Sequence, residues 1–495
     1  MFLLALSVYV VTGNGRVQTA DWVEEVSVAS SLAHGQGVIA PGQVVVGGGV
    51  QPGRHGRTYA AHDIGSSLLA YPLARFLPAR WLWAGSTLID PIATAIAVVV
   101  FTVLVADLGA SSTSALAAGV LFAFASIAWP FAHISFDVTP TSLFLLLAFW
   151  CVTRIRRARN NVAWALAGGL SAGWAIMMRI DSAFPVIPIT AAALYLAWTG
   201  RHRWHRAAGV VVAWMLPLVF AVAVYWWYNW LRFGSIFNSG HNGDPNTQMN
   251  GSLLGGLAGQ LVSPGRGLIV FSPLVLLALL GWRRLWRIDP HVTLAAATAI
   301  IGALLVHARL ANWSGEDTWG PRYLVPVAGL ALVPLGHALD LLRQVPRQGL
   351  RASAGLLVAV AIGVQVVGAS TAYYEAKVDD VVSSGNVTFH SLYWTPAHAQ
   401  LYVDARDLYR GLSGDPPYLT VDRGGRAPAV EAPVDWWWAN NLAAHRYEPL
   451  ALITVPLCLL LAVASSVVLR RRWWNDGSLF SSPGPVRGRR SEPSA

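Results

Sequence analysis

Long apolar segments, separated on one side by short clusters of arginine, are the feature that most limits the folds open to this chain. A backbone inside lipid has to satisfy its own hydrogen bonds, which favours helices. Hydrophobic residues make up 55% of the 495 residues and charged residues only 12%, against about 25% in a soluble globular protein. We therefore expect an all-α polytopic membrane protein.

About twelve apolar segments are long enough, or nearly so, to span the bilayer. They are expected at residues 1–13, 82–106, 113–131, 137–153, 162–179, 183–199, 207–228, 267–282, 291–309, 322–341, 352–371 and 448–469. The first is short for a span, since crossing takes about 20 apolar residues. It lacks the basic start and small-residue cleavage site of a signal peptide, so we interpret it as a first span with its N-terminus inside.

The arginine clusters give an independent check on this topology. They fall in the connections 154–161, 200–206, 282–290 and 342–351, and in the tail from Arg470. The alternation of spans places all of them on one side, which the positive-inside rule makes cytoplasmic. The net charge of +10 is explained by these loops and does not indicate nucleic acid. We expect a plasma (inner) membrane protein whose remaining loops face outward.

Four parts follow from this topology. They are a transmembrane core with outer loops at 1–371, an extracytoplasmic segment at 372–447, a last transmembrane helix with a basic flank at 448–474, and a disordered cytoplasmic tail at 475–495. The run Trp436–Trp438 precedes the last span and is interpreted as an interfacial aromatic anchor. Cys151 and Cys458 lie in apolar segments and are expected to act as small buried hydrophobic residues.

Three carboxylates closely follow the first apolar segment. A helix would place Asp21, Glu24 and Glu25 on one face. The residues after them continue a helical pattern that Gly35 and Gly37 would end, which predicts an amphipathic helix along the outer surface. Asp21 is the candidate catalytic base. Glu24 and Glu25 are interpreted as a solvated face near a helix N-terminus, where carboxylates are favoured.

His62 and Asp63 form a second polar group, just before another apolar stretch. They are expected at the membrane boundary. A histidine there can bind a ligand or orient a carboxylate, so both are candidate substrate-binding residues. The alternative is a surface histidine beside an aspartate that caps a helix.

Charged residues at the outer ends of later spans complete the candidate substrate-binding set. They are Arg179, Arg266, Glu316, Asp317 and Arg322, together with the adjacent Tyr323. Arginine can bind phosphate oxygens through two N–H groups, and ionisable groups near the bilayer often mark function. Two alternatives stand beside this interpretation. Arg179 can pair with Asp181, and the arginines at 266 and 322 can reach lipid headgroups.

Five short motifs occur in a fixed order on the predicted outer face. They are Asp21 with Glu24, Glu25 and Ser31-Leu32-Ala33-His34-Gly35; Tyr59 through Leu69; Tyr228 through Gly234; Ser263 through Pro273; and Trp319 through Pro326. In this order the chain resembles the GT-C superfamily of integral-membrane glycosyltransferases, in particular the bacterial branch related to protein O-mannosyltransferases and the lipid A aminoarabinose transferase. The resemblance covers about residues 14 to 340.

The resemblance implies a polyprenyl-phosphate-linked sugar as donor and an acidic residue in the first outer loop as base. Asp21 stands at that position. Trp22 stands where a second acid often follows, and only some relatives use a metal, so a divalent metal is left open and no cofactor is assigned. The implied activity moves the sugar to an envelope glycan, lipid or protein on the outer face of the membrane.

Two other activities share part of this pattern. A transporter or flippase of a lipid-linked saccharide would need charges along a path through the bilayer, and would often show repeat symmetry. Here the polar residues gather at one face, which favours the enzyme. A glycan polymerase or ligase uses the same outer-face chemistry and differs only in its product.

Overall fold

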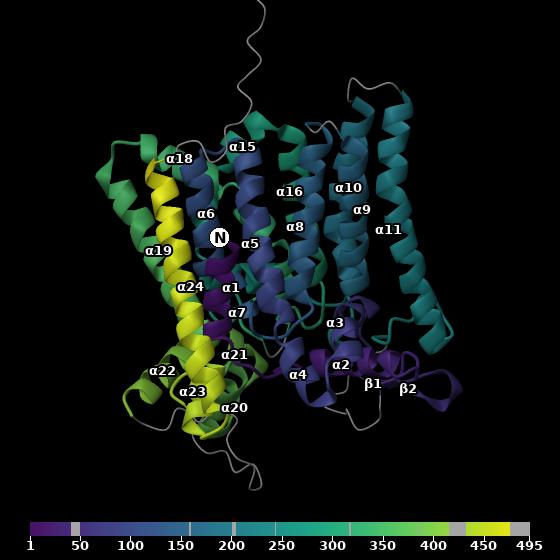
Figure 1. Cartoon of the computed structure of the whole chain (residues 1–495), viewed down its shortest axis with the longest axis vertical. Coiled ribbons are helices and arrows are strands. Elements are labelled where there is room, and N and C mark those ends of the chain that lie inside the picture. The colour runs from purple at the N-terminus through teal and green to yellow at the C-terminus, as the bar shows by residue number, and fades with distance from the viewer. Residues whose placement is uncertain are drawn as a thin grey trace, which may run out of the picture.

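Helices packed side by side form the body of the molecule (Figure 1). The structure is a computed structural model that describes residues 1–40, 50–157, 160–199, 204–242, 244–315, 318–385, 387–414 and 432–475. Within these ranges, eight helices are long and apolar enough to cross a membrane. They contain α5 (Ile89–Asp107), α8 (Val138–Ile155), α9 (Asn161–Met178), α10 (Ala183–Thr199), α11 (Trp204–Phe233), α16 (Pro290–Ala308), α19 (Gln348–Gly368) and α24 (Glu448–Asn475). The chain is thus a helical, multi-pass membrane protein.

The remaining predicted spans are shorter or interrupted. The helices α17 (Val325–Leu332) and α18 (Leu335–Gln344) meet at 46° and count as a ninth span only if taken together. The apolar helices α1 (Phe2–Thr12) and α6 (Ser112–Phe124) have 11 and 13 residues. The twelve-span count therefore stays a prediction.

One expected span is not a continuous helix. Residues 267–282 contain α13 (Leu268–Phe271) and α14 (Leu274–Leu279), and Ser272 between them has non-helical backbone angles. The break falls where Pro273 follows, because proline disfavours the helical conformation of the residue before it. The prediction of one unbroken helix here was wrong for that reason.

The arginine clusters lie together at one end of the bundle, which we call the basic end. Arg154 pairs with Asp107 at 3.1 Å, and Arg156 pairs with Asp289 at 3.3 Å. These contacts join the ends of α8, α5 and α16 beside α15 (Trp282–Ile288), at the top of Figure 1. The predicted gathering of basic loops on one side is confirmed within the described residues.

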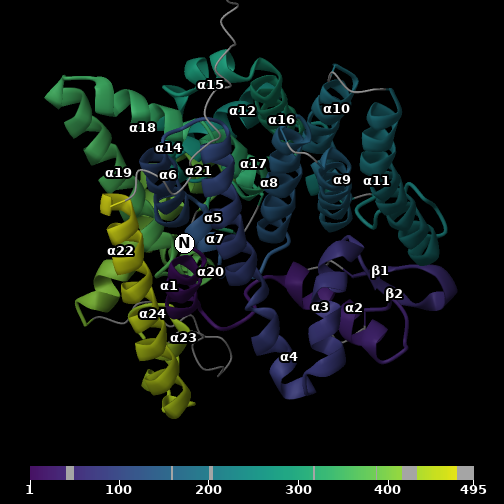
Figure 2. The same ribbon diagram turned by 45° about the horizontal axis from the view of Figure 1, so that its top comes forward.

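The opposite end, which we call the site end, holds two groups of short elements (Figures 1 and 2). The first group is α2 (Ala20–Ala33), β1 (Val50–Pro52), β2 (Thr58–Ala60), α3 (Ile64–Phe76) and α4 (Ala79–Ser86). The second group comes from the predicted extracytoplasmic segment and comprises α20 (Tyr373–Ser384), α21 (Phe389–Trp394), α22 (Gln400–Leu412) and α23 (Trp437–Ala443). The strands β1 and β2 are antiparallel, with Gln51 opposite Tyr59.

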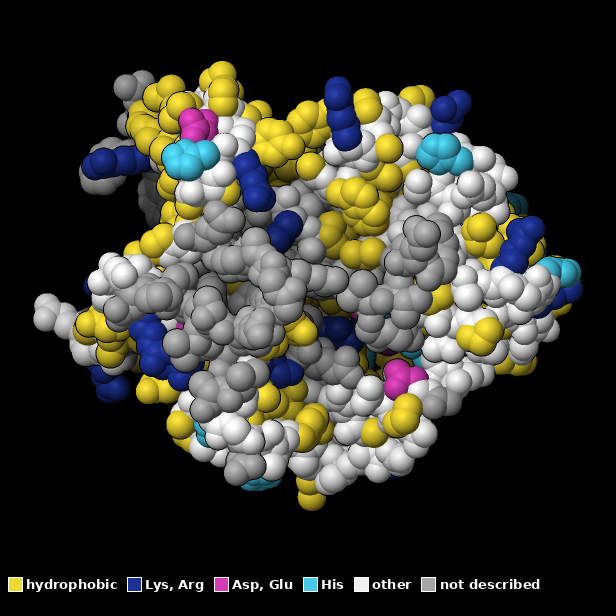
Figure 3. Space-filling view, turned by 90° about the horizontal axis from the view of Figure 1, so that it is seen from below, with side chains coloured by type: hydrophobic (Ala, Val, Ile, Leu, Met, Phe, Trp, Pro, Cys, Tyr) yellow, Lys and Arg dark blue, Asp and Glu magenta, His cyan; other side chains and the backbone are white. Residues whose placement is uncertain are grey.

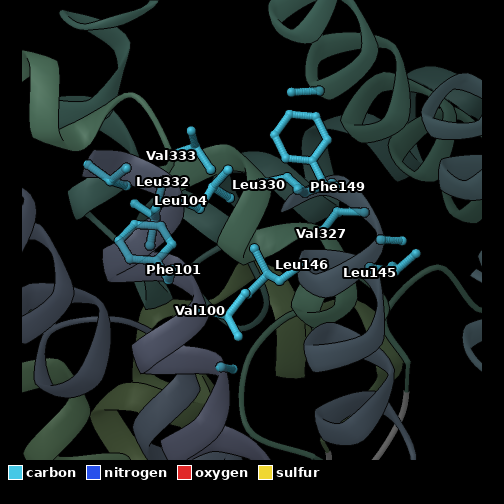
Figure 4. Packing of buried hydrophobic residues seen from close by; sticks show 14 of the residues in the cluster. Val100, Phe101, Leu104, Leu145, Leu146, Phe149, Val327, Leu330, Leu332 and Val333 are labelled. Atoms are coloured by element: carbon cyan, nitrogen blue, oxygen red, sulfur yellow. The ribbon is translucent and has the colours of Figure 1, made fainter. Parts of the chain in front are cut away.

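Close side-chain packing holds the bundle together, since lipid offers little hydrophobic drive for helix association. Phe101 of α5 stacks on Phe122 of α6 with ring centroids 4.5 Å apart, and Leu146 of α8 lies near α17 in the same cluster (Figure 4). On α9, a Cβ at Gly169 would lie 2.1 Å from the Trp214 carbonyl oxygen of α11. Only glycine permits this approach of the two backbones.

The tryptophan run before α24 has a specific structural partner. The indole N–H groups of Trp437 and Trp438 donate to the carbonyls of Val10 and Val11, at 2.8 and 2.9 Å. These carbonyls belong to the last turn of α1, where helix carbonyls lack intrahelical partners. The run therefore caps the first helix in addition to any role as an interfacial anchor, which stays a prediction.

Candidate active site

The helix α2 carries the predicted base. It begins at Thr19, whose hydroxyl accepts from the Trp22 N–H at 3.3 Å, as an N-cap residue does. It ends before Gly35, whose φ of +72° favours glycine. The predicted helix and its ends are confirmed.

The placement of α2 differs from the prediction. Its residues Trp22, Val26 and Ala29 are fully buried and pack on Ala70 and Ala74 of α3. The helix is therefore wedged inside the site end and does not lie along the surface. The predicted surface position was wrong because the apolar side chains flank the acidic face on both sides.

Asp21 faces charged residues from two other parts of the chain. The Nε2 atom of His62 lies 3.6 Å from its Oδ1, and an Nη1 of Arg322 lies 3.9 Å from its Oδ2. Its side chain remains 25% exposed, unlike its neighbours on the helix. Burial alone would raise the pKa of Asp21, but the positive charges of His62, Arg322 and Arg179 outweigh it and lower the pKa. Asp21 is thus an ionised carboxylate that a substrate can reach.

Glu24 and Glu25 are each only 1% exposed, so the predicted solvated helix face is wrong. Neither has a hydrogen bond of regular geometry among the described residues. Glu24 lies 3.4 Å from His62 Nε2. Burial, followed by the charge of Asp21, raises the pKa of Glu24 to about 8. Burial and the nearby Asp137 raise that of Glu25 well above its ordinary value. Both therefore favour the protonated form, which leaves Asp21 as the ionised carboxylate of the helix.

His62 and Asp63 both reach the site, but only His62 contacts Asp21. Asp63 accepts a hydrogen bond from the Ile180 N–H at 2.8 Å, which ties the start of α3 to the end of α9. It occupies the N-cap position of α3 without making a side-chain cap bond. A Cβ on the following Gly65 would lie 2.5 Å from the Met178 nitrogen, so this contact needs glycine. Asp63 therefore positions the loop that presents His62.

Arg179 is paired twice. Its Nη1 contacts both Asp137 oxygens at 3.0 Å, and its Nη2 donates to Asp181 at 2.8 Å. The expected Arg179–Asp181 pair is confirmed. His307 also contacts Asp181, at 2.9 Å, and its ring stacks on Tyr323 at 4.7 Å. Arg179, Asp181 and His307 form one ionic network beside the Asp21 cluster.

Arg322 and Tyr323 approach the site from the start of α17. Besides its contact with Asp21, the Arg322 guanidinium lies over the rings of Phe136 and Tyr323, at 4.9 and 5.2 Å. Such stacking orients the planar group. Arg322 and Arg179 thus bring two positive charges near Asp21.

Arg266 lies elsewhere. Its Nη1 donates to the Thr318 carbonyl at 2.6 Å and to Gln400 of α22, and its guanidinium lies 5.4 Å from the Tyr393 ring. These partners belong to the second group of site-end elements, so the structure does not bring Arg266 into contact with Asp21. Glu316 and Asp317, also predicted for the site, fall outside the described residues.

Four residues of the site were absent from the sequence-based set. They are Asp137, Arg232, His241 and His307. Asp137 and His307 stand at the outer ends of predicted spans, where the same rule that selected Arg179 could have found them. Arg232 is fully buried, and its Nη1 donates to the carbonyls of Ala60 and His62 at 2.5 and 2.9 Å. It holds the loop that carries His62.

Few acidic side chains appear on the visible surface of this end (Figure 3), which agrees with the burial of the carboxylates. Within the described part of the chain, no three His, Cys, Asp or Glu side chains are placed to share a metal ion. The neighbours of Asp21 that supply positive charge are His62 and Arg322. The described residues do not fit a metal at Asp21, and no step is assigned to one.

Comparisons with known proteins give structural likeness only. No family profile matches the chain, and no curated protein matches its sequence. The structure of ArnT from Cupriavidus metallidurans in the apo state is similar at 13% identity, covering 93% of this chain and 74% of that one, with a TM-score of 0.49. The same protein bound to undecaprenyl phosphate gives 15% identity, coverages of 81% and 73%, and a TM-score of 0.45.

The archaeal oligosaccharyltransferase AglB from Archaeoglobus fulgidus, in complex with an inhibitory peptide and a dolichol-phosphate, is also similar. The identity is 11%, the coverages are 74% of this chain and 54% of that one, and the TM-score is 0.44. ArnT and AglB both belong to the GT-C superfamily. At such low identities and TM-scores the likeness carries no argument about substrate, so function has to be argued from the residues of this chain.

Proposed function

We propose that this chain is a membrane glycosyltransferase that moves a sugar from a polyprenyl-phosphate donor to an acceptor on the outer face of the membrane. The observation that supports this best is the placement of Asp21. It is an accessible, ionised carboxylate with a histidine on one side and an arginine on the other, at the membrane-facing base of a helical bundle.

The carboxylate supplies the first half of the reaction. An acceptor hydroxyl loses its proton to Asp21 as its oxygen attacks the anomeric carbon of the donor sugar. The Asp21 pKa is lowered, so the base is ionised before the acceptor arrives. His62 lies within 3.6 Å of Asp21 and is held by Arg232 through its main-chain carbonyl. It fixes the carboxylate in the orientation needed for proton transfer.

The arginines supply the second half. The bond between the anomeric carbon and the phosphate oxygen breaks, and the electron pair leaves with the lipid phosphate. Positive charge placed where this negative charge develops lowers the barrier. Arg322 is the arginine that contacts Asp21, and Arg179 adds its charge from the neighbouring network. Base and leaving-group stabiliser thus lie on opposite sides of the space next to Asp21.

The orientation is argued from the two ends of the bundle. Arginine-rich loops mark the cytoplasmic side of a membrane protein, and they lie at the basic end, opposite Asp21. The active site would therefore face outward in the plasma (inner) membrane. The apolar helices provide the surroundings that a polyprenyl tail needs, which accounts for a sugar-transfer site built on a multi-pass protein.

The experiment uses the full chain in liposomes with a polyprenyl-phosphate sugar that carries a radiolabel on the sugar. Envelope extract supplies the acceptors. Formation of a labelled glycoside together with free polyprenyl phosphate is the expected result. Movement of intact labelled lipid across the bilayer, with no glycoside formed, would instead establish a flippase. Product length separates a single-sugar transferase from a polymerase or ligase.

A further inference from the structure

A second cavity lies at the site end, away from Asp21. It is bounded by the loop at Gly265 and Arg266 and by α20, α21 and α22. Its empty space measures about 390 Å³, including the open mouth. That is a size at which pockets hold small polar ligands. The function proposed above does not use this cavity.

The charged side chains that line the cavity balance one another. Arg266 and Lys377 bring two positive charges, and Asp380 and Asp404 bring two negative ones. His398 donates to or accepts from Asp380 at 2.9 Å. A cavity built for a phosphate would have an excess of cations, and one built for a basic peptide an excess of carboxylates. This lining favours a ligand that is polar but uncharged.

Asp404 identifies what kind of polar group the ligand presents. Its side chain is 0% exposed, and neither carboxylate oxygen has a hydrogen bond of regular geometry among the described residues, although Gln400 lies close to it. A buried carboxyl without partners is costly. Groups that can satisfy both oxygens are hydrogen-bond donors, and hydroxyls also suit the neutral form that burial and the nearby Asp407 favour by raising the Asp404 pKa.

Aromatic rings provide the other feature of the lining. Tyr373 and Tyr393 both border the cavity. The backbone of Tyr393 is fixed, since its carbonyl accepts from the Ser263 hydroxyl at 2.5 Å and from the Gly265 N–H at 3.2 Å. A pyranose or furanose ring has hydroxyls at its edge and C–H groups on its faces. It therefore matches a pocket with a few polar groups beside rigid aromatic walls.

A short loop connects this cavity with the Asp21 cluster. The Thr318 carbonyl accepts from Arg266, and the Gly320 N–H donates to Gln400 at 3.3 Å. Two residues later, Arg322 contacts Asp21. A ligand in the cavity would thus be bound by residues that share the loop 318–322 with the reacting site.

We propose that the cavity between α20, α21, α22 and the loop at Arg266 binds a neutral sugar residue of the acceptor. The acceptor is then a glycan or a glycolipid and not a protein side chain. This inference rests on the proposed transferase function for the word acceptor. The binding of a neutral saccharide to the cavity does not depend on it.

The test measures binding without donor or turnover. The full-length protein in nanodiscs is titrated with mannotetraose, cellotetraose and galactotetraose, and binding is followed by saturation-transfer NMR. Tetragalacturonate and tetralysine are the charged comparators. We expect at least one neutral tetrasaccharide to bind and both comparators to fail. Asp404→Asn should weaken saccharide binding about tenfold or more, because a charged hydrogen-bond acceptor is lost.

Two further variants make the assignment specific. Asp407→Asn is the matched control, since Asp407 is one helical turn away, pairs with Arg406 at 2.9 Å and does not line the cavity. It should leave binding unchanged. Val403→Phe places bulk into the cavity from its wall and should abolish binding while the charges stay. A thermal melt of each variant establishes that it is folded.

Three results would overturn the proposal. They are binding of no neutral saccharide, preferential binding of a charged comparator, and saccharide binding that folded Asp404→Asn and Val403→Phe leave unchanged. Each is distinct from failure of the transferase proposal, which would show as absence of labelled glycoside in the liposome assay.

Discussion

The two ends of the helical bundle treat carboxylates in opposite ways. At the basic end, Asp107 and Asp289 each pair with an arginine on a neighbouring helix, at 3.1 and 3.3 Å. At the site end, Glu24 and Glu25 are buried without a hydrogen bond of regular geometry among the described residues. Isolated buried carboxyls reduce stability, and proteins retain such groups mainly where they serve function.

The difference lies in where the cations go. At the basic end they are distributed, one arginine to one aspartate. At the site end, Arg322 and His62 converge on Asp21, and Glu24 and Glu25 are left to hold their protons. One ionised carboxylate among protonated neighbours is the arrangement a general base requires. If this comparison is right, removing charge at the site end should affect turnover, and removing it at the basic end should not.

The largest effect is expected for Asp21→Asn. The amide cannot accept the acceptor proton, so kcat should fall by about 10²- to 10⁴-fold. The lowered pKa of Asp21 adds a pH criterion, because the wild-type enzyme should keep this base ionised until the pH falls below the ordinary range of an aspartate. Initial rates of labelled glycoside formation between pH 4 and pH 8 provide the measurement, with the pH range an estimate set around.

Asp107→Asn at the basic end is the matched control for that variant. It makes the same chemical change in a residue that pairs with Arg154 far along the bundle. Its rate should equal that of the wild type. Equal losses in both variants would mean that the contrast between the two ends does not reflect catalysis.

The next effect is expected for Arg322→Gln. The change removes a positive charge next to Asp21, where the leaving phosphate is proposed to develop its charge, so kcat should fall on the order of 10²-fold. Arg154→Gln is the control, since Arg154 is also paired with a single aspartate. A change confined to KM would show that Arg322 binds the donor without stabilising the transition state.

Arg232→Gln tests a positioning role and should be weaker. Arg232 touches no predicted substrate group, but it holds the carbonyls of Ala60 and His62 and lies 3.7 Å over the Tyr228 ring. Its loss should lower kcat about tenfold through displacement of His62, equivalent to roughly 1.4 kcal/mol. Arg232→Lys keeps the charge and should restore part of the rate. Rates of both variants at equal folded fraction, measured by thermal melt, decide the point.

Sequence patterns were most reliable where a physical rule acts on many residues. The apolar segments and arginine loops predicted a multi-pass helical protein and its two distinct ends. They also selected Asp21, His62, Arg179 and Arg322, which the structure brings together. Each is a charged residue at the end of an apolar segment on one predicted side, so a single rule was enough.

The errors came from tertiary packing. Glu24 and Glu25 share a helical face with Asp21, and nothing local shows that α3 would cover that face. Arg266 was grouped with Arg322 because both lie at outer ends of spans, yet its partners Gln400 and Tyr393 are more than 120 residues away in sequence, as the contacts with separations of 134 and the Ser263–Tyr393 bond at 130 show. Such pairings depend on the three-dimensional arrangement of distant elements.

A smaller effect, on stability and not on rate, is expected for Glu24→Gln. Folding raises the Glu24 pKa from 4.5 to about 8. The folded protein therefore binds one proton more than the unfolded chain within that window, and stability falls as the pH rises through it. Glutamine resembles the protonated acid and removes this penalty. Near pH 8 the variant should melt on the order of 5 °C higher than the wild type, with little difference near pH 4.

Differential scanning fluorimetry of the purified protein across this pH range gives the melting temperatures. Glu448→Gln is a suitable control, because Glu448 is largely exposed at the start of α24 and 3.0 Å from His445. It should show no comparable dependence on pH. A wild-type protein whose melting temperature rose from pH 5 to pH 8 relative to Glu24→Gln would contradict the burial of a protonated Glu24, on a pH scale estimated from.

The smallest effect is expected at the basic end, for Arg156→Gln. Arg156 is 48% exposed and its partner Asp289 only 5%. Water screens the exposed member, so the pair should contribute only about 0–1 kcal/mol to the free energy of unfolding. Asp289 also accepts from the Val292 N–H as the N-cap of α16, so it keeps a partner when the arginine is lost. The melting temperature should change by no more than about 2–4 °C, and glycoside formation should be unchanged. A large loss of turnover would show that charge at the basic end is coupled to the site, and the contrast between paired and converging charges would then no longer separate structure from catalysis.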